Sequence, residues 1–179
     1  MTNNETHTQG AEPADIVLIE AVSLDQLADI FRSAGYRVTV VEQNGASQLM
    51  SASQGIGFAV RGGNALPQAS APAAAYLDYT LSCTLQVQGD LPADLVPSWN
   101  RTKRFARLAS HGAFLVLEMD VVAAGGVSER HLRSMTELWD RLIQELLLHL
   151  RNRPAMAAEE AVAAGDDPAR EALAPGAAQ

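Results

Sequence analysis

The chain has 179 residues, a formal net charge of −8 and a single cysteine. This length suffices for one domain that buries its own core without disulfide staples, and the lone Cys83 indicates a reducing compartment. The acidic balance argues against a nucleic-acid-binding surface, because such a surface needs an excess of basic residues. No stretch has the ~20 consecutive apolar residues that a membrane span requires. We therefore expect a cytoplasmic protein.

Composition along the chain predicts three segments. Residues 1–14 are polar without periodicity, which is typical of a flexible N-terminal tail. Residues 15–152 carry periodic apolar patterns, and we expect them to form a single domain. Residues 153–179 are dominated by Ala, Gly, Pro and acidic residues, so we expect a disordered C-terminal tail.

The first half of the domain is predicted to be a helix followed by three strands. The helix should begin at Ser23, because Ser23 and Gln26 match a capping box, and it should end at Gly35. Asn44-Gly45 is a strong reversal signal, which makes the strands an antiparallel meander. The expected strands are residues 36–42, 48–52 and 56–61. Residues 62–75 contain two prolines and many small residues, and they are expected to form a loop between strands.

The next elements are a strand and a short helix. Residues 77–88 alternate between apolar and polar side chains, the period of a strand with one buried face. The short helix after it carries Trp99. Asp94 is its expected cap, and Pro97 should lie in its first turn, because a proline deeper in a helix breaks its hydrogen bonds.

The domain should close with a β-hairpin and a long helix. The hairpin is predicted from residues 105–110 and 113–122, with the turn at His111-Gly112. Apolar residues then recur at the helical period over residues 128–150. These elements predict an α+β fold: an antiparallel sheet, a meander plus a hairpin, packed by an N-terminal helix, a short middle helix and a long C-terminal amphipathic helix.

No constellation of catalytic residues is apparent. The four histidines are scattered without metal-ligand spacing, and Gly55 and Gly57 lead into a strand rather than into the helix that a phosphate site requires. Cys83 alternates in phase with apolar neighbours and is expected to be a buried hydrophobe. We therefore expect no enzyme, no metal, no cofactor, no small-molecule substrate and no membrane partner.

The predicted hairpin has two apolar faces. If Ser110 pairs with Ala113, then Phe105 lies opposite Glu118, and Arg107 is a diagonal neighbour of Glu118. The core face would consist of Ala106, Leu108, Leu115, Leu117, Met119 and Val121. The opposite face would consist of Phe105, Arg107, Phe114, Val116 and Glu118, and an apolar face of this kind is typical of a binding surface.

Three explanations of this second face remain open. A protein partner or a second subunit could cover it, which would make the five residues a partner-binding site. The first helix or the loop 62–75 of the same chain could cover it instead. The third alternative is nucleic acid, because Arg101, Lys103 and Arg104 form a basic run with Arg107 that is flanked by Trp99 and Phe105.

Several motifs resemble one protein family. They are Tyr79 to Val87 (YTLSCTLQV), Trp99-Asn100-Arg101 followed by Arg104-Phe105-Ala106-Arg107, Leu117-Glu118-Met119-Asp120-Val121, and Gly125-Gly126-Val127-Ser128 leading into Leu138-Trp139. In this order and spacing they resemble the YbjN family of bacterial sensory-transduction regulators, over roughly residues 16 to 150. The resemblance implies an α+β fold similar to type III secretion chaperones, without catalytic residues. It also implies a regulatory role in stress, motility or surface properties.

From these observations we expect a non-enzymatic, chaperone-like or regulatory protein that acts by protein–protein contact. A homodimer is the expected assembly, using the second hairpin face and the end of the last helix. A nucleic-acid-binding regulator that uses residues 101–107 is the alternative.

Overall fold

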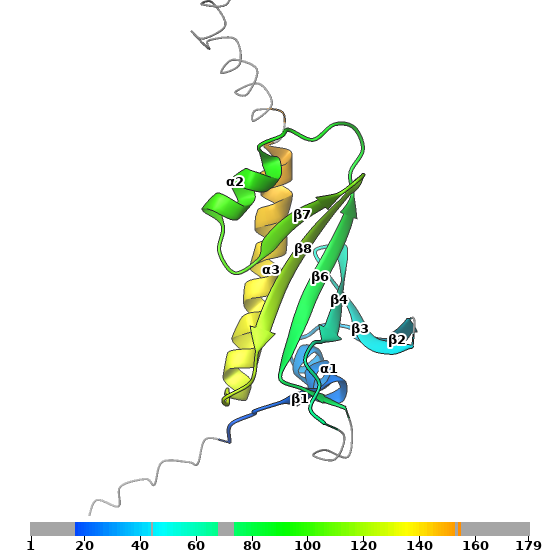
Figure 1. Cartoon of the computed structure of the whole chain (residues 1–179), viewed down its shortest axis with the longest axis vertical. Helices are drawn as coiled ribbons and strands as arrows, with labels where there is room; N and C mark the ends of the chain where they lie inside the picture. Colours follow the sequence, from blue (N-terminus) through cyan, green and yellow to red (C-terminus); the bar gives the residue numbers. More distant parts are fainter. Residues whose placement is uncertain (1–16, 44, 68–73, 153, 155–179) are drawn as a thin grey trace, which may run out of the picture.

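The computed structural model describes residues 17–43, 45–67, 74–152 and 154, and within these ranges the chain has a mixed α+β architecture (Figure 1). Six strands form one antiparallel sheet. Three helices accompany it in the described ranges, as the sequence predicted. In spatial order the strands are β2 (Thr39–Gln43), β3 (Ala46–Ser53), β4 (Ile56–Gly62), β6 (Asp78–Gln86), β8 (Phe114–Val122) and β7 (Arg107–His111).

The predicted meander and hairpin join in one sheet through β8. This strand pairs with β6 on one side and with β7 on the other, so the later strand β8 lies in the middle and β7 becomes an edge. β2 is the opposite edge (Figure 1). Each edge strand leaves backbone groups without a strand partner on one side, and the two edges differ in whether other described residues hydrogen-bond to those groups.

Helix α1 (Leu24–Ser33) forms as its sequence predicts. The Ser23 hydroxyl accepts a hydrogen bond from the Gln26 backbone N–H, and the Gln26 side chain accepts one from the Ser23 N–H. Gly35 follows the helix at φ +91°, a conformation that suits glycine. The buried stripe of α1 packs on the core face of the sheet, where the Phe31 ring lies 6.0 Å from the Phe58 ring.

Helix α3 (Glu129–Arg151) covers the same core face. Ser128 caps it by accepting a hydrogen bond from the His131 N–H. Its apolar stripe is buried, and the Trp139 ring packs edge-on at 5.9 Å from Phe58. Cys83 lies in this core, and burial raises the pKa of its thiol to about 11, so the side chain serves as a small hydrophobe, as predicted.

A two-stranded sheet and a folded loop complete the base of the domain. β1 (Val22–Ser23) pairs with β5 (Ala75–Tyr76), and these two-residue strands were not predicted. Within the loop, Ala65 bridges to Tyr76, and Asp78 accepts hydrogen bonds from the backbone and the side chain of Asn64. The described part of the loop is therefore ordered by its own contacts, whereas residues 68–73 lie outside the described ranges.

Helix α2 (Leu95–Thr102) fastens the edge strand β7 to α3. The Trp99 indole N–H donates to the Ala106 carbonyl at 3.1 Å. The side-chain amide of Asn100 pairs with both backbone groups of Leu108, donating to its carbonyl and accepting from its N–H, each at 2.9 Å. Asn100 thus occupies hydrogen-bonding positions of the β7 edge that another strand would use.

Contacts at both ends of α2 hold it against α3. The His149 ring nitrogen hydrogen-bonds with the Leu95 carbonyl at 3.0 Å, and Lys103 forms an ion pair with Glu145 at 2.8 Å. Pro97 lies in the first turn, as expected. Asp94 occupies the N-cap position, as expected, but its side chain makes no capping hydrogen bond and forms an ion pair with Arg101 at 3.1 Å.

The predicted register of the β7–β8 hairpin was wrong by two residues. His111 pairs with Phe114, so the turn consists of Gly112 and Ala113, with Gly112 at φ +58°. Arg107 is consequently opposite Glu118, where the prediction made them diagonal neighbours. Because a shift of two preserves the side-chain period of a strand, every residue within the paired strands keeps its predicted face, whereas Phe105 lies before β7. The core-face residues Ala106, Leu108, Leu115, Leu117, Met119 and Val121 are all buried.

Candidate protein-binding face

The candidate site lies on the side of the β7–β8 hairpin that faces away from α1 and α3. We call it the outer hairpin face and define it by Phe105, Arg107, Phe114, Val116 and Glu118. The register places these residues in cross-strand rows: Arg107 opposite Glu118, Val116 opposite Ala109, and Phe114 opposite His111. The strand pairing therefore brings four of the five predicted residues onto one surface, and Phe105 lies in the segment that leads into β7.

A network of charges occupies the centre of this face. The Arg107 guanidinium donates to Glu118 at 3.0 Å and also to the Asp120 carboxylate. Arg61 on β4 approaches the other Glu118 oxygen at 3.4 Å, and the Thr80 hydroxyl on β6 donates to Asp120 at 2.6 Å. Two arginines and two carboxylates compensate one another across four strands, so the centre of the face is polar but close to neutral.

Three members of this network were not among the predicted site residues. Asp120 follows Glu118 at the two-residue spacing of a strand face, and this period could have identified it. Arg61 and Thr80 come from strands whose pairing with β8 is not encoded in local sequence. They could be found only once the strand order was known.

The network lowers the pKa of Asp120. Burial alone would raise this pKa, but hydrogen bonds from Thr80 and Arg107, together with the charge of Arg107, outweigh burial and hold it below the ordinary value of 3.8. The Asp120 and Glu118 carboxylates in turn raise the pKa of Arg107, chiefly through its hydrogen bond to Asp120. A carboxyl group whose pKa is lower in the folded state stabilises the fold above the unfolded-state pKa, and this contribution is lost as the pH falls through the folded-state value.

Replacing Arg107 by Gln should raise the Asp120 pKa toward 3.8. A carboxyl-carbon NMR titration measures this directly. Arg101→Gln, which removes an arginine that pairs with Asp94, is the matched control and should leave Asp120 unchanged. The stability lost near neutral pH should be at most about 1 kcal/mol, because both partners are substantially exposed. An Asp120 midpoint unaffected by Arg107→Gln would contradict the ion pair.

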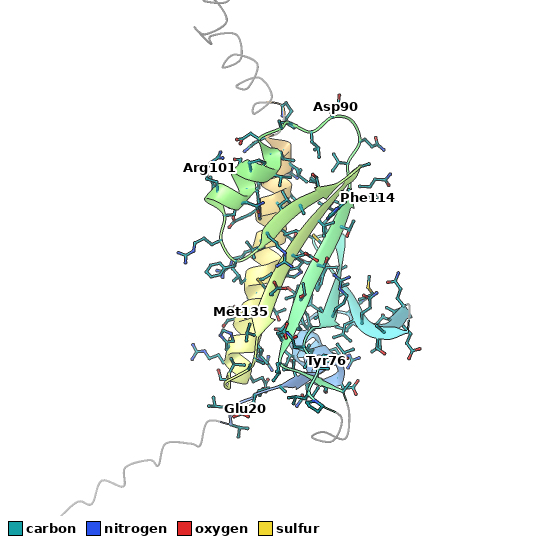
Figure 2. The ribbon with its side chains drawn as sticks, in the orientation of Figure 1. Glu20, Tyr76, Asp90, Arg101, Phe114 and Met135 are labelled. Atoms are coloured by element: carbon teal, nitrogen blue, oxygen red, sulfur yellow. The ribbon has the colours of Figure 1, made fainter. Side chains whose placement is uncertain are left out.

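Exposed aromatic residues flank the charged centre. Phe114 is 43% exposed at the start of β8, and Phe105 is 66% exposed in the segment that leads into β7 (Figure 2 labels Phe114). Phe105 also has φ +74°, a backbone conformation that is unfavourable for a bulky residue. Its ring is accompanied by the Arg104 guanidinium at 5.4 Å. The positive φ of Phe105 costs free energy and its exposed ring buries little apolar surface, so this residue contributes little to the stability of the fold.

The rest of the described chain leaves this face open. The first-helix alternative was wrong, because α1 packs against Phe58 on the opposite side of the sheet. The described parts of the loop 62–75 lie near Asp78, which pairs with Val122 at the other end of β8 from Phe114. Residues 68–73 are outside the described ranges.

The predicted basic run is largely engaged within the protein. Arg101 pairs with Asp94, and Lys103 pairs with Glu145 and lies 5.9 Å from the centre of the Trp99 ring. Arg104 stacks on Phe105, and Arg107 belongs to the charge network. Arg101 is on α2, apart from Phe114 (Figure 2). These partners reduce the positive charge that the run presents to a polyanion.

A second surface feature is an open hollow of about 610 Å³ between the end of α1, β3 and α3, lined in part by Tyr36, Ser51 and Asp140. The Asp140 carboxylate accepts hydrogen bonds from the Ser53 hydroxyl and from the Gln144 amide, so it fastens α3 to β3. In the described ranges, no group of three or more metal-ligating side chains is present. None of the helices described is both long enough and apolar enough to cross a bilayer.

Comparison with known proteins yields no relative: no family model, no curated protein and no solved structure matches this chain. Its class is therefore defined by its own geometry, as an α+β protein with a helix-covered antiparallel sheet and one open, partly aromatic sheet face.

Proposed function

We propose that this chain is a non-enzymatic protein that acts by binding another protein through the outer hairpin face. The observation that carries the proposal is the pair of exposed aromatic residues, Phe105 and Phe114, on either side of a self-compensated charge network. Aromatic residues and arginine are enriched among the residues that dominate binding energy at protein interfaces.

The charge network supports a protein partner over a polyanion. Glu118 and Asp120 already neutralise Arg107, so a nucleic-acid phosphate would have to compete with two carboxylates. A protein surface can instead cover Phe105 and Phe114 and leave the network intact. Ion pairs that are already formed specify the geometry of an interface more than they add affinity.

More specifically, we propose a bacterial regulatory or chaperone-like protein that is cytoplasmic and homodimeric. It would be similar to the YbjN family and to type III secretion chaperones. This proposal rests on the resemblance of the sequence motifs. Within these motifs, Trp99 and Asn100 fasten α2 to the edge strand β7.

Removing the aromatic anchors should abolish partner capture while the domain remains folded. Phe105→Gly is the sharpest variant, because glycine tolerates the positive φ and should relieve about 1 kcal/mol of strain. Phe114→Glu places a charge where the Phe114 ring would contact the partner. Each variant should weaken capture at least about tenfold, which corresponds to roughly 1.4 kcal/mol of binding free energy.

The experiment is affinity capture from extracts of the source cells, with circular dichroism to verify folding. Val17→Glu is the matched control, since Val17 is an exposed apolar residue outside the sheet. A specific partner that is retained by Val17→Glu and lost by both anchor variants would support the proposal. Equal capture by all four proteins would reject it.

A further inference from the structure

Within the described ranges, no other element covers the edge strand β2, unlike the edge strand β7. β7 is covered by the Asn100 amide and by α2, whereas β2 pairs with β3 alone in the described chain. All five residues of β2 are exposed. Natural sheets usually protect such an edge with charged side chains, lysine above all, or with proline, a bulge or a covering element, and β2 has Glu42 as its single charged residue. The residues Thr39-Val40-Val41-Glu42-Gln43 include neither lysine nor proline.

The unpaired backbone groups of β2 are identified by its register. Gln43 pairs with Ala46 across a two-residue turn, and antiparallel pairs alternate between bonded and non-bonded positions. Thr39 and Val41 therefore use their backbone groups toward β3. The N–H and C=O groups of Val40 and Glu42 point outward, where they are available to another strand.

Exposed apolar side chains gather at this same edge. Val40 is 48% exposed, Val41 is 38% exposed, and Met50, which pairs with Thr39, is 36% exposed. They lie at the β2 edge, which is the opposite edge of the sheet from β7. The edge thus combines free hydrogen-bonding groups with β-branched side chains that would be buried by one more strand.

We propose that β2 pairs antiparallel with β2 of a second copy of this chain, so that the two sheets become one continuous sheet. A two-fold axis perpendicular to the sheet requires that paired residues share a face, which restricts the registers. With Val40 on the axis, Val40 pairs with the second copy's Val40, Thr39 with its Val41, and Val38 with its Glu42.

Contacts between apolar side chains and the separation of like charges both favour this register. On one face it places Val41 of each copy beside Thr39 of the other, next to Met50, so the exposed apolar groups become contiguous. It also separates the two Glu42 carboxylates, which a register centred on Glu42 would place directly opposite each other at a cost. The strand is therefore complementary to itself, and a second copy is the occupant it fits.

This inference goes beyond the proposed function, because it assigns self-association to β2 and leaves the outer hairpin face for a different protein. The test is sedimentation velocity of the full chain over a concentration series, with wild type, Val40→Lys, Phe105→Gly and Phe114→Glu. Val40→Lys adds a charge at the pairing axis but alters an exposed position, so the protomer should fold normally. It should raise the dimer dissociation constant at least about tenfold.

Phe105→Gly and Phe114→Glu should dimerise like wild type, even though they are expected to lose partner capture. Hydrogen exchange gives a second readout, because the amides of Val40 and Glu42 should become protected as the wild-type concentration rises. A wild-type protein that stays monomeric at every concentration would overturn the inference. So would a dimer that persists in Val40→Lys, or one that is lost in Phe114→Glu.

Discussion

Replacing Trp99 by Ala should destabilise the domain by about 3–5 kcal/mol, the usual cost of truncating a fully buried tryptophan. Trp99 is completely buried, its ring packs edge-on against His149 at 5.6 Å, and its indole N–H donates to the Ala106 carbonyl. The substitution would remove the packing between α2 and α3 and leave a carbonyl unpaired. Urea denaturation followed by circular dichroism measures the loss.

Two further variants separate packing from hydrogen bonding at Trp99. Trp99→Phe keeps an aromatic ring but removes the indole donor, so it should cost about 1–2 kcal/mol. Leu148→Ala on α3 truncates a side chain that is 56% exposed, and it should change stability by less than about 0.5 kcal/mol. If Trp99→Ala cost no more than Leu148→Ala, the docking of α2 would not be a stabilising feature.

Replacing Asn100 by Ala should cost about 2–3 kcal/mol, although Ala favours the helical conformation of α2. The Asn100 amide satisfies both backbone groups of Leu108, a residue that is 2% exposed. Without the amide, a buried N–H and a buried C=O lose their partners, and the β7 edge is opened. We expect lower stability in urea and faster hydrogen exchange of the Leu108 amide.

Asn100→Asp distinguishes the two hydrogen bonds. A carboxylate can still accept from the Leu108 N–H, but it places an oxygen against the Leu108 carbonyl, so the variant should also be destabilised. Thr102→Ala, in the same helix, removes an exposed hydroxyl that bonds to the Ser98 carbonyl, and it should be nearly neutral. Unchanged protection of the Leu108 amide in Asn100→Ala would refute the edge-covering role.

Local signals predicted much of the fold. The capping box at Ser23, the glycine after α1, the start of α3 at Ser128 and the alternation of β6 depend on residues close in sequence, and all were confirmed. The two faces were also correct for the hairpin residues within the paired strands. The side-chain period of a strand is two, so the wrong choice of turn residues moved the register by two and exchanged no face.

Long-range contacts could not be predicted in this way. The two hydrogen bonds between Asn100 and Leu108 join a helix side chain to a strand backbone, and no sequence periodicity indicates them. The charge network needs Arg61 from β4 and Thr80 from β6 beside β8, which depends on the order of strands in the sheet. The two-residue strands β1 and β5 are too short to show a pattern.

Site-specific photo-crosslinking tests the central claim about the outer hairpin face most directly. A benzophenone amino acid would replace Phe114 in one protein, Phe105 in a second and the control residue Val17 in a third, each expressed in the source cells. We predict one discrete crosslinked protein from positions 114 and 105 and none from position 17. No adduct at either aromatic position, or the same adducts at all three, would contradict a binding role for this face.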